Sequence, residues 1–286
     1  MAASRARTVF GKDGLAGKMR RLSSARQEMI RPVLERPREH VLLSLRDMAN
    51  ALHSAPATLL RAIRGLGFPS YYDFRRYLHD LALSQSTSLD VIERSPRTHG
   101  QASLDQDLRN LQALRNTLDW KRVLALTKRI YAARRIVIIG GDMAKNLVGL
   151  LDYELALLGF NCVSAITAGE ILHRVRHLGR KDLVIAFSFR RGLRQTVEGL
   201  KQARGKGAYC VGITDTLVSP IARYSQECFV TPTEGVSFAW SYVAPAAFIN
   251  VLMVACANYR RARTVVILKE TANEQRSGFR WYPGEV

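Results

Sequence analysis

The stretch Leu45–Phe68, LRDMANALHSAPATLLRAIRGLGF, decides how the first part of the chain folds. An apolar-periodic helix ends near Leu52, a break follows at His53-Ser54-Ala55, and a second helix starts at Pro56. Two short helices joined by a tight turn form the helix-turn-helix plan. The sequence therefore predicts such a pair near the amino terminus.

The second helix of this pair has two chemically different faces. Thr58, Arg61 and Arg64 lie three apart, so they form one polar, cationic stripe. Gly67, which can adopt positive φ, then ends the helix. A stripe of this kind suits the major groove of DNA, whereas an ordinary helical hairpin with a solvated basic face is the alternative that this segment alone leaves open. Four residues at helical spacing are expected to pack inward: Leu59, Leu60, Ile63 and Leu66.

Length and charge narrow the class of protein. The 286 residues are enough for about two domains, and 47% are hydrophobic, as in a folded globular protein. The net charge is +19 and the pI is about 10.4. Residues 1–80 hold 15 Lys or Arg and 7 Asp or Glu, a net of +8. Such a balance predicts a polyanionic partner: nucleic acid first, an anionic membrane surface second.

The cysteines and the apolar segments indicate a cytoplasmic protein. The four cysteines are scattered without CxxC spacing, which favours reduced core residues over disulfides or a metal site. No signal peptide is visible. The most apolar stretch, Val243–Ala257, has only 15 residues and contains Pro245. We therefore expect neither membrane association nor a cofactor.

Further helices complete the predicted DNA-binding domain, residues 1–83. One should begin near Ser23 or Ser24 and run towards Glu35, after a loose arm over residues 1–14. Another should span Tyr71–Leu83, and near its start lie residues suited to phosphate contacts: Tyr71, Tyr72, Arg75 and Arg76. The Ser-rich residues 84–103 are predicted to be a linker.

From residue 104 onward the pattern predicts an α/β domain. Two helices are followed by short apolar runs that alternate with helix-length segments, which is typical of a parallel sheet covered on both faces. A long apolar helix, about Phe238–Tyr259, follows. Residues 263–286 are assigned to a tail whose first part, about Arg263–Gln275, is expected to be helical. The predicted fold is an all-α helix-turn-helix domain followed by a three-layer α/β domain with a five-stranded parallel sheet. The five strands are Ile136–Ile139, Cys162–Ile166, Leu183–Phe187, Ala208–Ile213 and Cys228–Val230.

Two turns of this domain could bind an anion. Gly140-Gly141 follows the first strand, and Ser188–Gly192 follows the third. In open α/β sheets, ligands bind at the carboxyl ends of strands, where helix N-termini present free N–H groups. Asp142 stands where a dinucleotide fingerprint would have its second glycine, so a dinucleotide site is not predicted.

Over about residues 15–262 the chain resembles the RpiR-type bacterial transcriptional regulators. The resemblance implies an N-terminal helix-turn-helix domain and a C-terminal sugar-isomerase-like (SIS) domain that binds a phosphosugar effector. The residues that carry it are Leu22–Ala25, Glu35–Pro37, Leu43–Ala49, Pro56–Thr58, Arg61, Leu66–Phe68, Tyr72–Arg75, Arg135–Gly140, Ala186–Phe189, Gly212–Asp215, Ser219–Ala222 and Thr233-Glu234.

The chain departs from this family in the phosphate loops. The family serine of the first loop is Ala144 here, and of the hydroxyls usual in the loop after the third strand only Ser188 is present. Arg190 and Arg191 stand in that loop instead, and a guanidinium can bind a carboxylate as well as a phosphate. We therefore expect a small anionic effector, a phosphosugar or a carboxylate, near Gly140, Gly141, Ser188, Arg190, Arg191, Glu234, Ser237 and Ser241.

The sequence thus predicts a transcriptional regulator that acts as a homodimer or homotetramer. The helix that starts at Pro56 would enter the major groove of a pseudo-palindromic double-stranded operator. The helix Tyr71–Leu83 would contact phosphates. The residues expected to contact DNA are Ser54, Ala57, Thr58, Arg61, Arg64, Tyr71, Tyr72, Arg75 and Arg76.

Two other functions remain as alternatives. A sugar-phosphate isomerase would need an acid–base group, for which Glu234, His173 or His177 are candidates. The i,i+4 spacing of the two histidines could also pair metal ligands, but the neighbouring residues are basic, which favours a solvated face. Attachment to a membrane surface is poorly supported, because neither end of the chain carries a basic amphipathic helix.

Overall fold

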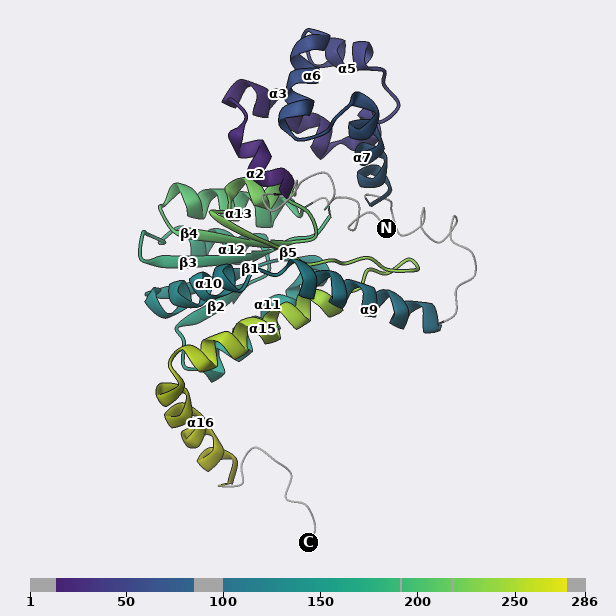
Figure 1. The fold of residues 1–286 in the computed structure, drawn as a ribbon. Coiled ribbons are helices and arrows are strands. Elements are labelled where there is room, and N and C mark those ends of the chain that lie inside the picture. Colours follow the sequence, from purple (N-terminus) through teal and green to yellow (C-terminus); the bar gives the residue numbers. More distant parts are fainter. Residues whose placement is uncertain (1–13, 85–99, 191, 218, 277–286) are drawn as a thin grey trace.

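The computed structural model describes residues 14–84, 100–190, 192–217 and 219–276. Most of the predicted arm and most of the predicted linker lie outside these ranges. Residues 277–286 of the tail and Arg191 lie outside them as well. The described chain holds a helical region followed by an α/β region (Figure 1).

The helical region confirms the predicted helices and adds two, α2 and α4. Leu59 and Ile63 of α6 and Leu66 directly after it pack in one core with residues of the neighbouring helices. Leu60, which was also expected to pack inward, is half-buried and is not part of this core. The helix α2 was not predicted, and its Leu15 packs on this same core. In order, the elements are α2 (Gly14–Arg21), α3 (Ser24–Glu35), α4 (Pro37–His40), α5 (Leu45–Ala51), α6 (Pro56–Gly65) and α7 (Tyr71–Ser84).

Local caps and turns fix where these helices begin and end. The Ser44 hydroxyl accepts the Asp47 N–H at 3.2 Å and caps α5. His53 adopts φ 48° in the turn between α5 and α6, a conformation that costs a non-glycine residue about 1 kcal/mol. Gly67 adopts φ 92° after α6, as its predicted role as a helix terminator requires.

The second region contains a five-stranded sheet in which every pair of neighbouring strands is parallel. The strand order is β2-β1-β3-β4-β5, so β1 and β3 lie side by side. The strands are β1 (Arg135–Ile139), β2 (Cys162–Ala165), β3 (Asp182–Phe187), β4 (Tyr209–Thr214) and β5 (Glu227–Val230). The helices are α9 (Gly100–Thr117), α10 (Trp120–Ala132), α11 (Lys145–Leu157), α12 (Ala168–Val175), α13 (Arg194–Gly205), α14 (Pro220–Tyr224), α15 (Val243–Tyr259) and α16 (Arg261–Arg276).

Both faces of the sheet are covered, as the apolar strands predicted. Ile136 and Ile138 of β1 point into one core, which α9, α10, α11 and α15 complete. Val137 and Ile139 point into the other, which α12, α13 and α14 complete. Successive side chains of a strand point to opposite faces, so an uninterrupted apolar strand needs a helix layer on each side. Figure 1 shows these two layers.

The structure differs from the sequence prediction at both ends of the α/β region. The helix α9 begins at Gly100, inside the predicted linker. Helix α15 begins at Val243 and not at Phe238, because the Ser241 N–H bonds to the Thr233 carbonyl and holds the preceding residues as a loop. The helix α16 confirms the helix predicted at the start of the tail and begins two residues earlier, at Arg261.

The bend between the last two helices is sharp, 106° between α15 and α16. No single helix in the described part of the chain is long and apolar enough to cross a membrane. These two together meet that criterion by length and composition only.

Candidate functional site

The outer face of α6 carries the predicted cationic stripe. Leu59 and Ile63 are fully buried, whereas Arg61 and Arg64 are exposed and Thr58 is half-buried. The Arg61 Nε donates to the Ala57 carbonyl one turn earlier at 3.3 Å, so this side chain lies along its own helix. The predicted division of α6 into a core face and a cationic face is therefore confirmed.

The start of α6 is defined by proline and not by a capping side chain. Ala55 holds the N-cap position and gives no side-chain hydrogen bond, and Pro56 follows at the first helical position. The half-buried Ser54 directs its hydroxyl to the Ala55 carbonyl at 3.4 Å. Ser54 and the exposed Ala57 thus lie at the end of α6 that a recognition helix directs to base edges.

On α7, three of the four predicted phosphate contacts are exposed and one is not. Tyr72, Arg75 and Arg76 are exposed. Tyr71 is half-buried, and its hydroxyl donates to the Leu43 carbonyl at 2.8 Å. Burial raises the pKa of the Tyr71 phenol. The nearby Arg75 lowers this pKa and Asp47 raises it, both by less than burial does. The only proton of the Tyr71 hydroxyl is engaged inside the protein, so Tyr71 holds the helices together and is not a free phosphate donor.

The second predicted site lies at the carboxyl ends of β1 and β3. Gly140 and Gly141 are buried where β1 turns towards α11. A Cβ on Gly140 would lie 2.7 Å from a Val148 methyl group, and one on Gly141 would lie 2.4 Å from a Leu193 methyl group. Both glycines are therefore closely packed, and the Leu193 side chain covers the backbone at Gly141.

Ser188 is present in the loop after β3 but faces inward. Its side chain is only 3% exposed, and its hydroxyl accepts the Leu193 N–H at 3.2 Å. The predicted role of Ser188 as an effector ligand is therefore corrected: it braces the turn that leads into α13. The adjacent Ala144 is buried and has no hydroxyl to offer.

Arg190 is held in an unusual conformation by two neighbours. Its backbone adopts φ 60°, and its N–H donates to both carboxylate oxygens of Asp215, at 2.9 and 3.1 Å. Its guanidinium carbon lies 3.5 Å from the centre of the Trp240 ring, a cation–π contact. The contacts to Asp215 and Trp240 offset the cost of a non-glycine residue in the left-handed region.

Asp215 and Tyr242 complete this cluster, which we call the Arg190 cluster: Asp142, Phe189, Arg190, Asp215, Trp240 and Tyr242. Burial raises the pKa of Asp215 although it accepts the Arg190 N–H. Burial also raises the pKa of Tyr242, and the charges of Asp142 and Asp215 add to that effect while Arg190 opposes it. The Phe189 and Tyr242 rings meet edge to face, 5.4 Å apart.

Five members of the cluster, all but Arg190, were not predicted from the sequence, and for three of them the reason is clear. Asp215 directly follows β4 and lies at the predicted ligand edge, so its position was a usable signal. Trp240 and Tyr242 fall in residues that had been assigned to a helix. Their loop, which connects β5 to α15, doubles back so tightly that a Cβ on Gly235 would lie 2.1 Å from the Ala239 carbonyl oxygen.

The remaining predicted effector residues lie in this same loop. Glu234 is exposed; its carboxylate accepts the Gln106 side chain at 3.3 Å, and its carbonyl accepts the Asn110 side chain at 2.8 Å, so it is tied to α9. The Ser241 hydroxyl accepts the Val243 N–H at 3.2 Å at the start of α15. Ser237 is half-buried.

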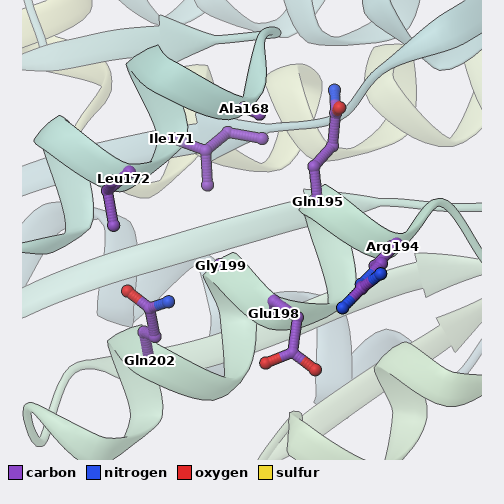
Figure 2. Close-up of a pocket in the computed structure, with 8 residues that line it drawn as sticks. All are labelled: Ala168, Ile171, Leu172, Arg194, Gln195, Glu198, Gly199 and Gln202. Atoms are coloured by element: carbon purple, nitrogen blue, oxygen red, sulfur yellow. The ribbon is translucent and has the colours of Figure 1, made fainter.

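A separate cavity of about 400 Å³ lies between α12 and α13. Figure 2 shows Ile171 and Leu172 on α12 facing Gly199 of α13, with Arg194 and Gln195 at one end. A Cβ on Gly199 would lie 2.2 Å from an Ile171 methyl group, so the two helices touch there. None of the predicted effector residues lines this cavity.

The two histidines considered as metal ligands are exposed on α12 and just after it. Among the described residues, no group of three or more His, Cys, Asp or Glu side chains is arranged to hold a metal ion.

The α/β region matches a known family model, described as the SIS domain, over residues 129–255. This part of the chain is a SIS domain. The helix pair α5–α6 precedes it, an arrangement similar to that of the RpiR-type regulators. The crystal structure of the sugar isomerase domain of an RpiR transcription factor from Sphaerobacter thermophilus is 26% identical and covers 62% of this chain and 99% of its own, with a TM-score of 0.59.

Other similar proteins match a larger part of the chain. An uncharacterized HTH-type transcriptional regulator of Haemophilus influenzae is 23% identical over 73% of this chain and 75% of its own length. The HTH-type transcriptional regulator HexR of Pseudomonas aeruginosa is 23% identical over 74% of this chain and 75% of its own. The structure of the Vibrio vulnificus NanR protein, complexed with ManNAc-6P, is similar in fold over 91% of this chain and 97% of its own, with 21% identity and a TM-score of 0.57.

Proposed function

We propose that this protein is a DNA-binding transcriptional regulator whose SIS domain binds a small anionic effector and thereby modulates operator binding, without catalysing a reaction. The observation that carries the proposal is the division of α6: its inner face is fully buried, and its outer face presents Arg61 and Arg64 to solvent. The names of two relatives support it, since both are HTH-type transcriptional regulators.

In this proposal α6 enters the major groove. Thr58, Arg61 and Arg64 face base edges, with Ser54 and Ala57 at the start of the helix. Tyr72, Arg75 and Arg76 contact phosphates from α7. Tyr71 supports them from inside, through its bond to Leu43.

The regulator acts as a dimer or tetramer on a pseudo-palindromic operator. Helix α15 buries one side in the core of the α/β region, and its exposed side mixes the apolar Val243 and Val254 with Asn250 and Asn258. Val254 is 61% exposed, and Leu104 and Leu108 of α9, which packs beside α15, are 59% and 64% exposed. Large exposed apolar side chains on two neighbouring helices are typical of an interface, so a second copy of the chain is the occupant that we assign to this face. An effector that changes how two such copies are held would alter operator affinity by about 1–3 kcal/mol.

Gel-shift titration of the operator selected from random duplexes tests the DNA-binding face. We expect Arg61→Ala and Arg64→Ala each to weaken binding to that operator about 5- to 100-fold, because each removes a contact to a base edge. Arg176→Ala, which removes an exposed arginine of the SIS domain, is the matched control and should bind as the wild type does. Unchanged affinity and sequence preference in both α6 variants would refute the assignment of this face.

A further inference from the structure

Helix α16 exposes large apolar side chains although it is part of the folded α/β region. Val265, Val266 and Leu268 are 43%, 56% and 41% exposed. Among residues 261–274, Thr264 is the one buried residue. Figure 1 shows α16 extending away from the sheet and from the helices that cover it. Neighbouring exposed apolar side chains of this kind indicate a surface that another molecule covers.

Hydrogen bonds in the first turn of α16 fix the angle at which it leaves the body. The Arg263 guanidinium donates to the carbonyls of Leu158 and Gly159, both at 2.9 Å. The Thr264 hydroxyl donates to the Ala257 carbonyl at 3.0 Å. These bonds join α16 to the turn after α11 and to α15, so the 106° bend between α15 and α16 is held from both sides.

The anchored side and the outward side of α16 differ in composition. Ile267 faces the body, since a Cβ on Gly159 would lie 3.1 Å from one of its methyl groups. Glu270 and Glu274 lie three and seven residues after Ile267, and helical spacing places them on its side. The same spacing places four exposed residues on the outward side, which we call the α16 stripe: Arg261, Val265, Leu268 and Lys269.

A surface of complementary composition lies on the first half of α9. Leu104 and Leu108, one turn apart, are 59% and 64% exposed, and the exposed Asp105 lies beside them. Arg109, one turn after Asp105, directs its guanidinium to the Gln106 side-chain oxygen at 2.8 Å. Two apolar side chains with an acidic neighbour thus match the two apolar side chains of the α16 stripe, whose neighbours are cations.

Within one copy of the chain these two surfaces are far apart. The first half of α9 lies beside the start of α15, because the Asn110 side chain donates to the Glu234 carbonyl in the loop that leads into α15. Helix α16 leaves from the other end of α15, whose 17 residues span about 25 Å. Figure 1 shows α16 and the first half of α9 at opposite ends of α15.

Twofold symmetry can bring the two surfaces together between two copies. When two copies pair through the exposed side of α15 with these helices antiparallel, the start of one α15 lies beside the end of the other. The α16 stripe of each copy then reaches the first half of α9 in the other copy. A parallel pairing would place the two α16 stripes against each other, where their cations would repel.

We propose that α16 is an arm that each copy of the chain lays across the first half of α9 in a second copy, so that the α16 stripe packs against Leu104 and Leu108. The apolar side chains supply the affinity. The charges fix the orientation, since exposed ion pairs add little to affinity. This inference rests on the proposed function only for the presence of a second copy on the exposed side of α15.

Sedimentation equilibrium of the full chain without DNA tests the contribution of α16. Leu268→Asp places a carboxylate against an apolar and acidic surface, so the dissociation constant of the dimer should rise at least about 10-fold. Gln202→Asp adds the same charge to an exposed position of α13, on the other helix layer, and is the matched control. It should leave the dissociation constant unchanged.

Crosslinking then identifies the surfaces that meet, without destabilising α16. Two forms of the chain, Leu108→Cys and Val265→Cys, would be coexpressed with different tags and treated with a short bismaleimide. Both would carry Cys162→Ser, because the other three native cysteines are buried. We expect more crosslinked product between the two forms than between two copies of either form.

Several outcomes would overturn the inference. These are a wild-type monomer, an effect of Leu268→Asp no larger than that of Gln202→Asp, and the absence of crosslinks between the two cysteine forms. Crosslinks mainly between two Val265→Cys chains would show that the α16 helices pair with each other, which also refutes it. Wild-type binding to phosphatidylglycerol vesicles that Leu268→Asp abolishes, with unchanged association, would assign the α16 stripe to a membrane instead.

The failure of this inference and the failure of the proposed function can be told apart, because neither measurement contains DNA. A dimer that crosslinks as expected but binds no operator would refute the proposed function and leave this inference standing. A dimer that binds an operator but does not crosslink between α9 and α16 would do the reverse.

Discussion

Asp182 is the buried charge on which the start of the sheet depends. Its carboxylate side chain is 0% exposed, yet it receives the Arg134 guanidinium at 2.8 Å and the Gly179 N–H at 2.9 Å, with Arg135 at 3.8 Å. Burial alone would raise the pKa of Asp182, but these hydrogen bonds and charges outweigh burial and lower it. The folded state therefore prefers the ionised form.

We expect Asp182→Asn to lower the melting temperature at pH 7 by about 3–8 °C, because it removes a charged hydrogen-bond acceptor from a buried position. The lowered pKa means that the ionised carboxylate stabilises the fold above its ordinary pKa of about 4, and this stability is lost as the pH falls through the lower pKa of the folded state. The difference between wild type and variant should therefore shrink below about pH 4, as measured by melting curves between pH 7 and pH 3.

Asp105→Asn is the matched control for this measurement, because it removes an exposed carboxylate of α9. It should change the melting temperature by less than about 1 °C at pH 7. A constant difference between Asp182→Asn and wild type across the whole pH range would contradict the assigned pKa shift.

Tyr71 offers a second test at the scale of one residue. Tyr71→Phe removes the bond from its hydroxyl to the Leu43 carbonyl, so the free energy of unfolding should fall by about 1 kcal/mol, measured by urea denaturation followed by circular dichroism. Tyr72→Phe removes an exposed hydroxyl and should leave stability within about 0.3 kcal/mol of wild type. The reverse ranking of the two variants would show that Tyr71 is not a packing residue.

At the scale of the element, the exposed side of α15 yields a prediction about assembly. Val254→Lys places a charge in the middle of the face that we assign to a second copy, so the dissociation constant of the oligomer should rise at least about 10-fold, as measured by sedimentation equilibrium. Gln202→Lys adds the same charge to an exposed position of α13, on the other helix layer, and should leave the mass unchanged. A wild-type monomer would remove the basis of the prediction.

Helices and strands whose apolar residues recur at a regular spacing could be predicted from the sequence. Elements without such a spacing could not. The α6 stripe and the five apolar strands were found because their side-chain spacing follows directly from backbone geometry. Helix α2 was missed because GLAGKMRR is short and contains two glycines, and its place depends on Leu15 reaching a core formed by later residues. The start of α15 was missed because Phe238–Tyr242 is apolar enough for a helix but is held as a loop through Thr233.

At the scale of the whole molecule, the sequence located the ligand edge but not the groups that shape it. The rule that ligands bind at the carboxyl ends of parallel strands placed Gly140 and Arg190 correctly at that edge. It could not show that Ser188 points inward or that Trp240 stacks on Arg190, because those contacts join segments far apart in the chain. The cationic face of α6 was easier to predict, because a single helix contains all of its residues.

The glycine at position 199 has a consequence for the body of the SIS domain. With only a hydrogen atom there, α13 can lie directly against Ile171, and this one contact sets the width of the cavity that opens beside it. Any larger side chain at this position would push α13 away from Ile171 of α12. Leu193, which directly precedes α13 and lies against Gly141, would move with that helix, so the packing at the end of β1 depends partly on position 199.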